Sequence, residues 1–189
     1  MPLPLTNWQN FYVIVGSSAG ALTGLQFVVL TLIAQARVTS SMREISAFGT
    51  PTVVHFCTAL MVSALMTVPW QSLTQLGVCL GLGGLAGVVY SAGTIWHAHK
   101  SAYNPDIEDW IWYSALPLLA HLALIVAAVL LWWNSNSSLY AVAADVLLFL
   151  LIGIHNAWDS VTYIVVEHHS RPKIEQAESI GQDMQRDDS

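Results

Sequence analysis

Long apolar stretches separated by short polar ones make up most of this chain. No Asp, Glu, Lys or Arg occurs in residues 1–36 or 45–99, and only Asp145 and Asp159 interrupt residues 110–166. A helix needs about 20 apolar residues to cross the ~30 Å hydrocarbon core of a bilayer. The pattern therefore predicts an all-α, polytopic membrane protein, a bundle of five transmembrane helices at residues 8–36, 48–69, 72–98, 110–133 and 140–166.

The basic residues all fall on one side of the predicted membrane. The first loop, the third loop and the C-terminal segment contain all six of them, at Arg37, Arg43, Lys100, Arg171, Lys173 and Arg186. Cytoplasmic loops are enriched in Lys and Arg, so these three segments are expected inside the cell. The prediction is an N-terminus outside and a C-terminus in the cytoplasm, in the cell (inner) membrane of a prokaryote.

Composition adds a division into two parts. The chain is 54% hydrophobic and 10% charged, whereas about a quarter of a soluble domain is charged. We expect a transmembrane domain at residues 1–167, surrounded by the lipid bilayer, and a polar, disordered cytoplasmic tail at residues 168–189 that holds much of the acidic charge. No clustered basic patch is present, so a nucleic-acid partner is not expected.

Small residues at intervals of four mark two of the predicted helices. Glycines at this spacing lie on one face and let a second helix approach closely, which is how many helices pair in lipid. This glycine-zipper pattern predicts that the first and third helices cross each other, or that one of them joins a homo-oligomer. The residues for such an oligomer are Gly16, Gly20 and Gly24, or Gly83 and Gly87.

Aromatic residues gather at the predicted ends of the spans, as in the interfacial belts of membrane proteins. The outer belt would contain Trp8, Phe11, Tyr12, Trp70, Trp132, Trp133 and Tyr140, and the inner belt Trp96, Trp110, Trp112 and Tyr113.

Polar side chains inside the spans are the candidates for chemistry. His155 and Asp159 are one helical turn apart in the fifth helix, within hydrogen-bonding reach, and Asn156 lies beside them. A rise of 1.5 Å per residue places these three in the cytoplasmic half of the bundle, together with three residues from other helices. Those three are Gln26, His55 and His121. Asp145 is near the outer end of its helix, where we expect it to reach the interface.

Charged and polar groups in a bilayer usually face a protein interior and have partners. One interpretation is structural: His155, Asp159, Asn156 and His121 form a hydrogen-bonded network that fixes helix register, in a membrane subunit without a ligand.

Our main prediction is small-solute or proton-coupled transport, or a channel. Histidine changes its charge near neutral pH, so His55, His121 and His155 beside Asp159 have the chemistry of a proton relay. Asn156 and Gln26 would line the same site. Pro117, one turn before His121, permits the kind of broken helix that transporters use.

An intramembrane metalloprotein is the alternative. His55, His121, His155 and Asp159 are the residue types of a tetrahedral zinc site, and a zinc-bound water would make the protein a hydrolase. In another version, His121 and His155 are the two axial ligands of a haem. Zinc or haem is thus the cofactor that this alternative predicts.

The predicted orientation can be tested with reporters fused to each terminus. A cytoplasmic reporter, such as a fluorescent protein, should be active at the C-terminus, and a periplasmic one, such as alkaline phosphatase, at the N-terminus, because of the distribution of Lys and Arg. Activity of the cytoplasmic reporter at the N-terminus would contradict the orientation and the depths derived from it.

Overall fold

The computed structural model describes residues 4–35, 42–100 and 107–187. Within these ranges the chain is helical, and five helices are long and apolar enough to span a membrane, which confirms the predicted fold class. The elements in chain order are η1 (Pro4–Trp8), α1 (Gln9–Gln35), α2 (Met42–Thr67), α3 (Leu73–Lys100), α4 (Ile107–Trp110), η2 (Ile111–Ala115), α5 (Leu116–Leu130) and α6 (Ser135–Asp187). The apolar spans lie at Leu5–Leu32, Thr50–Thr67, Leu73–Trp96, Ile111–Leu130 and Ser135–Thr162.

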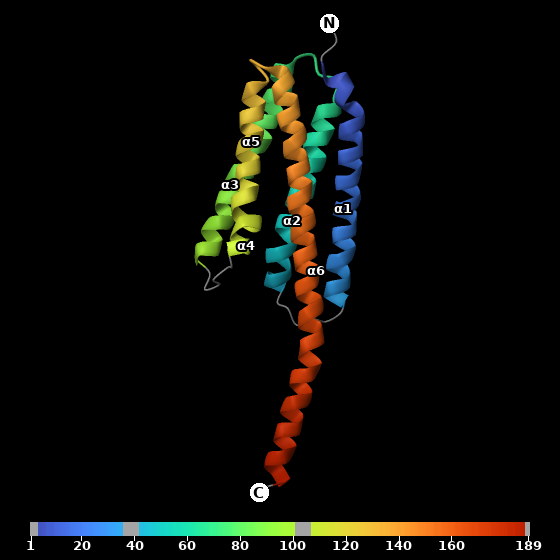
Figure 1. Cartoon of the computed structure of the whole chain (residues 1–189), viewed down its shortest axis with the longest axis vertical. Helices are drawn as coiled ribbons and strands as arrows, with labels where there is room; N and C mark the ends of the chain where they lie inside the picture. The colour runs from blue at the N-terminus through green and yellow to red at the C-terminus, as the bar shows by residue number, and fades with distance from the viewer. Residues whose placement is uncertain (1–3, 36–41, 101–106, 188–189) are drawn as a thin grey trace.

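Three predicted helices differ from those observed. The second begins at Met42 and not at residue 48. The fourth is composite, because the π-helical segment η2 joins α4 to α5. The fifth begins earlier than expected and continues as a helix to Asp187, through most of the segment 168–189 (Figure 1). The division into a transmembrane domain and a disordered tail stays a prediction, as does the orientation in the membrane.

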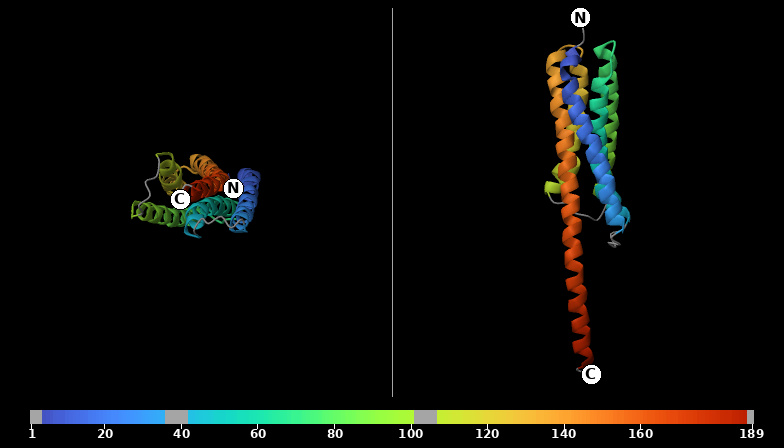
Figure 2. Two further views of the ribbon diagram at one scale, coloured as in Figure 1. Left: turned by 90° about the horizontal axis from the view of Figure 1, so that it is seen from below. Right: turned by 90° about the vertical axis from the view of Figure 1, so that its right-hand side faces the viewer.

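The helix α6 is the centre of the bundle. It packs against α2, α5 and α1, while α1 also packs along α2 and α3 packs along α5 (Figure 2). Although α2 and α3 are consecutive in the chain, they make few contacts with each other. One end of the bundle, called here the N-terminal end, holds the N-terminus, the α2–α3 connection and the α5–α6 turn (Figure 1).

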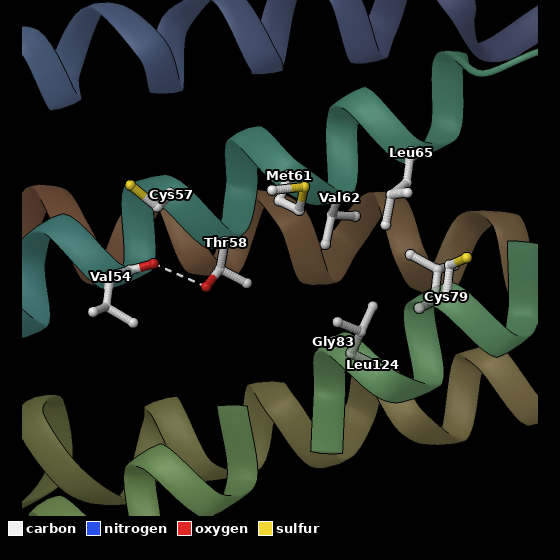
Figure 3. A pocket seen from close by; sticks show the side chains of 10 residues that line it. Val54, Cys57, Thr58, Met61, Val62, Leu65, Cys79, Gly83 and Leu124 are labelled. Carbon is white, nitrogen blue, oxygen red and sulfur yellow. Dashed lines mark hydrogen bonds between the residues drawn. The ribbon is translucent and has the colours of Figure 1, made fainter. Parts of the chain in front are cut away.

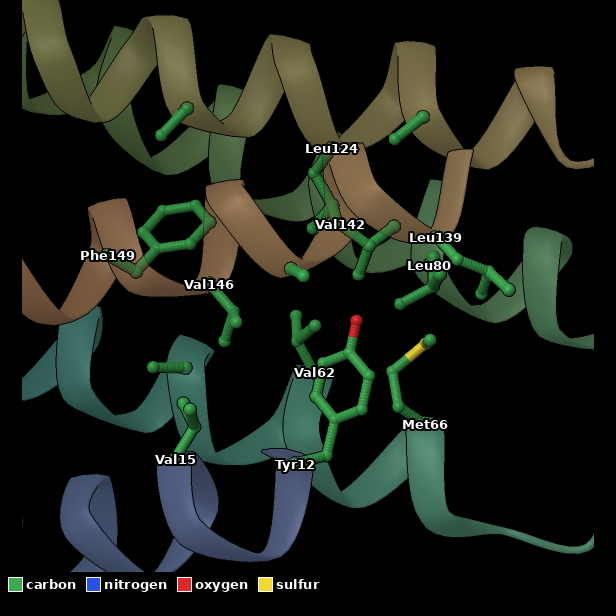
Figure 4. Packing of buried hydrophobic residues seen from close by; sticks show 14 of the residues in the cluster. Tyr12, Val15, Val62, Met66, Leu80, Leu124, Leu139, Val142, Val146 and Phe149 are labelled. Carbon is green, nitrogen blue, oxygen red and sulfur yellow. The ribbon is translucent and has the colours of Figure 1, made fainter. Parts of the chain in front are cut away.

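Buried apolar side chains fill the space between α1, α2, α5 and α6 (Figure 4). Phe149 and Val142 of α6 meet Val62 of α2 and Leu124 of α5 there. Tyr12, expected in the outer aromatic belt, is instead 1% exposed and points into this core. Tyr12 lies on the face of α1 that packs against α2, and this face is buried.

The glycines of α1 and α3 that have close neighbours contact α2 and α5, whereas the sequence suggested that α1 and α3 contact each other. A Cβ added at Gly16 would lie 3.0 Å from Ser63 Cβ of α2, and one added at Gly84 would lie 2.7 Å from Ile125 Cγ1 of α5. Thus α1 packs on α2 and α3 packs on α5, and we find no crossing of α1 with α3 through these glycines. Around Gly24 and Gly83 the space is open, with nothing within 4 Å of an added Cβ.

Gly87 is the tightest of these contacts, since the imidazole ring of His121 occupies the position that a Cβ would take. We predict that Gly87→Ala lowers the free energy of unfolding by about 1–3 kcal/mol, the usual cost of overpacking. The measurement is unfolding of the purified protein in detergent. Gly83→Ala is the matched control on the same helix, and its open surroundings should leave stability unchanged. Equal effects of the two substitutions would show that His121 does not rest on Gly87.

Candidate functional site

His121 of α5 lies in the middle of the bundle and is 1% exposed. Its Nδ1 is 2.7 Å from the Pro117 carbonyl oxygen and 3.5 Å from the Ser91 Oγ of α3. A carbonyl only accepts hydrogen bonds, so the proton of a neutral imidazole is on Nδ1 and Nε2 is the acceptor nitrogen. Gly87 permits this arrangement, because any larger residue would displace the ring.

His55 shares this layer of the bundle with His121. The ring of Phe149 is stacked on the His55 ring, with centroids 6.4 Å apart, and meets the His121 ring edge-on at 4.8 Å. His55 is 1% exposed, and both of its ring nitrogens are buried without a hydrogen-bond partner among the described residues. Phe149 therefore contacts two imidazoles that come from different helices, α2 and α5.

His155 and Asp159 lie further along α6, toward the end that carries α4. Trp112 is stacked on the His155 ring, with centroids 3.7 Å apart and planes within 15°. The Tyr113 hydroxyl donates a hydrogen bond of 3.1 Å to Asp159 Oδ2. The hydrogen bond recorded for this carboxylate thus comes from a phenol of η2, and not from His155 as the spacing suggested.

The irregular segment η2 supplies both of these aromatic partners. The Leu116 N–H bonds to the Ile111 carbonyl, five residues back, which is the pattern of a π-turn. Pro117 follows at once and has no N–H to give to the preceding turn. The helix is thus irregular next to Pro117, and Trp112 and Tyr113 reach α6 from this π-helical segment.

Asn156 and Asp145 of α6 are buried and unsatisfied. Asn156 is fully buried, and neither its amide oxygen nor its amide nitrogen has a partner in the described part of the chain. Asp145 is 5% exposed, and both carboxylate oxygens lack partners in the same sense. The expectation that Asp145 reaches the interface is wrong, because its side chain is buried among the helices that pack against α6.

The predicted site residues form two groups and not one cavity. His55 and His121 share one layer, His155 and Asp159 lie beside η2, and Gln26 is buried on α1. Within the described residues, no three His, Cys, Asp or Glu side chains are close enough to hold a metal ion. The four proposed zinc ligands are therefore not assembled, and the rings of His121 and His155 pack on Phe149 and Trp112, respectively.

Four residues of these layers were missed by the sequence reasoning. The contacts of Phe149 with the two histidines could not be predicted, because one apolar residue in an apolar span looks like any other. Ser91 is one small polar residue in a long apolar segment, so it gave no signal of a contact with His121. Tyr12 and Ser63 are buried, and each has a hydroxyl oxygen without a partner in the described structure. Only contacts between helices reveal such positions.

Comparison of the chain with protein families, with curated proteins and with solved structures finds no match. The chemistry of the site is therefore argued from its residues alone. They are the imidazoles of His55 and His121 against the ring of Phe149, the buried carboxyl group of Asp145 and the unsatisfied amide of Asn156. Imidazole, carboxyl and amide side chains are able to exchange hydrogen bonds, and the first two also protons. In the part of the chain that the structure describes, they do not form a cluster that could hold a metal ion.

A double-mutant cycle on Tyr113 and Asp159 tests the α5–α6 contact. Tyr113→Phe and Asp159→Asn should each reduce stability, and their coupling should be about 0.6–1.7 kcal/mol, the range for hydrogen bonds in membranes. Thermal unfolding in detergent of the two single variants and the double variant gives this coupling. Strictly additive effects would mean that the hydroxyl and the carboxylate do not interact.

Proposed function

We propose that this chain is a transport protein in which buried polar side chains along α6 carry protons through the bundle, alone or coupled to a small solute. The observation that carries the proposal is a set of unsatisfied polar side chains inside the spans. The side chains of Asp145, His55 and Asn156 are each at least nine-tenths buried and have no hydrogen-bond partner in the described structure.

Such groups are costly in a bilayer. An unsatisfied buried polar group costs about 1–3 kcal/mol, and charged residues inside spans usually mark ion or proton pathways. A purely structural network would be expected to satisfy its members, as Tyr113 does for Asp159. Three unsatisfied groups on contacting helices are better explained if water or a proton-carrying solute reaches them.

The geometry along α6 supports a path. Asp145, Asn156 and Asp159 fall within about 60° of arc, on the face toward α5, at 100° per residue. From Asp145 to Asp159 the helix rises about 21 Å, or most of the ~30 Å hydrocarbon core. His55 and His121 lie between the two acids, at the level of Phe149.

The groups have complementary roles in this proposal. His121 donates from Nδ1 to Pro117, which leaves Nε2 as the nitrogen that takes up a proton. His55 has both nitrogens available for the same exchange. Asp145 would take up or release protons toward the N-terminal end of the bundle, and Asp159 beside His155 toward the other end. Gln26 and Asn156 would bind water or a solute by hydrogen bonds.

Proton flux into liposomes tests the proposal. Purified protein is reconstituted into vesicles that contain a pH-sensitive dye, and a potassium gradient with valinomycin drives proton entry. We expect a flux above that of empty vesicles, which Asp145→Asn lowers by about tenfold or more, equivalent to a barrier raised by about 1.4 kcal/mol. Glu108→Gln is the control, since it removes an exposed carboxylate from α4 and should leave the flux unchanged.

Asn156→Leu separates a conducting role from a structural one. The substitution keeps the number and branching of the side-chain heavy atoms and removes an unsatisfied amide, so stability should stay the same or rise by about 1 kcal/mol while the flux falls. A less stable variant with normal flux would favour structural packing. Flux of the unaltered protein equal to that of empty vesicles would refute proton conduction.

A further inference from the structure

Protein side chains cover the acids at both ends of the proposed proton path. Asp145, toward the N-terminal end of the bundle, is 5% exposed. Asp159, toward the other end, is half-buried and accepts a hydrogen bond of 3.1 Å from the Tyr113 hydroxyl. If the chain carries protons as proposed, these acids have to exchange them with water, so one end of the path has to open.

The pocket between α2 and α3 is not expected to admit water to the path from the side. Its lining is mostly apolar, and its Thr58 hydroxyl already donates to the Val54 carbonyl at 2.8 Å (Figure 3). The pocket also lies within the spans of these two helices, where hydrocarbon surrounds a membrane protein. Opening is therefore expected at an end of the bundle.

The end that holds Asp145 is tightly packed. The ring of His121 in α5 occupies the place of a Cβ at Gly87 of α3. At the turn between α5 and α6, the Ser138 hydroxyl donates to the Ala127 carbonyl. Both contacts oppose a rotation of α5 after Pro117, so opening at this end would break close packing.

The segment η2, before Pro117, has an irregular backbone that α5 lacks. Its Leu116 N–H bonds to the Ile111 carbonyl, five residues back, in place of the usual four. A regular α-helix is ordinarily preferred, but there the ring of a proline clashes with the carbonyl of the fourth residue before it. Pro117 therefore disfavours the α-helical pattern at this point and brings it closer in free energy to the π-helical one.

A change of η2 from π-helical to α-helical hydrogen bonding would turn its side chains relative to α6. The change corresponds to about one residue, or about 100° around the helix axis. Trp112 would leave the ring of His155, which is now 3.7 Å away between centroids. The Tyr113 hydroxyl would leave Asp159 Oδ2 and the Asn156 carbonyl oxygen, at 3.1 and 3.4 Å. One backbone change would thus uncover the acid and the imidazole together.

We propose that η2 is a gate at the Asp159 end of the proton path, an inference that rests on the proposed function. In the closed form, η2 is π-helical, Trp112 covers His155 and Tyr113 holds Asp159. In the open form, η2 is α-helical and Asp159 exchanges protons with water. Tyr113 is a positioning residue in this gate, because it acts through Asp159 and does not carry the transported proton.

Proton flux into vesicles tests the gate with Tyr113→Phe. The substitution removes the hydroxyl that holds Asp159 and so weakens the closed form. We expect the flux to rise about threefold to tenfold, which corresponds to about 0.6–1.4 kcal/mol. Tyr140→Phe is the matched control, since Tyr140 is 63% exposed at the N-terminal end of the bundle and its flux should not change. A flux that Tyr113→Phe leaves unchanged or lowers would overturn the gate.

Amide hydrogen exchange follows the gate independently of flux. The full chain in nanodiscs is exposed to deuterated water and digested, and residues 111–116 are compared with residues 118–130. Exchange should be faster in residues 111–116 and rise about threefold to tenfold further in Tyr113→Phe, because opening breaks the bond from Leu116 to Ile111. Flux without this movement of η2 would refute the gate alone, whereas absence of flux from the unaltered chain would refute proton conduction itself.

Pro117→Ala provides a second test that does not weaken the contact with Asp159 directly. The substitution keeps the backbone carbonyl that accepts from His121 and removes the ring that disfavours the α-helical pattern. We expect slower exchange in residues 111–116, as in a regular helix, together with a flux about threefold higher or more. Pro51→Ala, at a proline inside α2, is the control and should leave both unchanged. Slower exchange with a lower flux would contradict an open α-helical form.

Discussion

The contact on which the bundle depends is a ring placed directly over a glycine. His121 of α5 rests on Gly87 of α3, and Phe56 of α2 lies where a Cβ at Gly153 of α6 would be 2.5 Å from its Cε1. In lipid, apolar side chains gain little from meeting each other, so close van der Waals packing has to hold helices together. These two contacts link four of the five spanning helices at mid-height, and they determine where the imidazole of His121 points.

The polar layers follow from that packing. Once His121 is held against Gly87, its ring meets Phe149, and Phe149 is also stacked on the ring of His55. The helix α6 packs against α1, α2 and α5, so Asp145 and Asn156 on its inward side are buried whether or not they find partners. Tyr113 provides one for the Asp159 carboxylate, whereas the side-chain amide of Asn156 has none in the described structure. The bundle thus keeps costly groups in its interior, and this pattern is typical of proteins that use them.

The five spans could be predicted because bilayer thickness fixes the length of an apolar run, whatever the helices later contact. The pairing of helices could not, since a glycine indicates only that something comes close. Gly16 proved to face Ser63, and Gly87 an imidazole. The depth of Asp145 in the membrane was likewise not enough to predict its exposure. Its burial depends on the neighbouring helices as well as on its distance from the end of α6. The partners of His155 and Asp159 depend on a π-turn, and Pro117 was its only local sign.

That π-turn also sets the angular register of the chain before it. A π-turn accommodates about one residue more than an α-turn, and one residue corresponds to about 100° around a helix axis. Without the π-turn, Trp112 and Tyr113 would be rotated by that angle around the helix axis. The contact of Trp112 with His155 and the hydrogen bond of Tyr113 to Asp159 would then both be lost. The aromatic contact of Trp112 and the hydrogen bond of Tyr113 therefore depend on the same backbone irregularity. A change in η2 would alter both of these contacts with α6 at the same time.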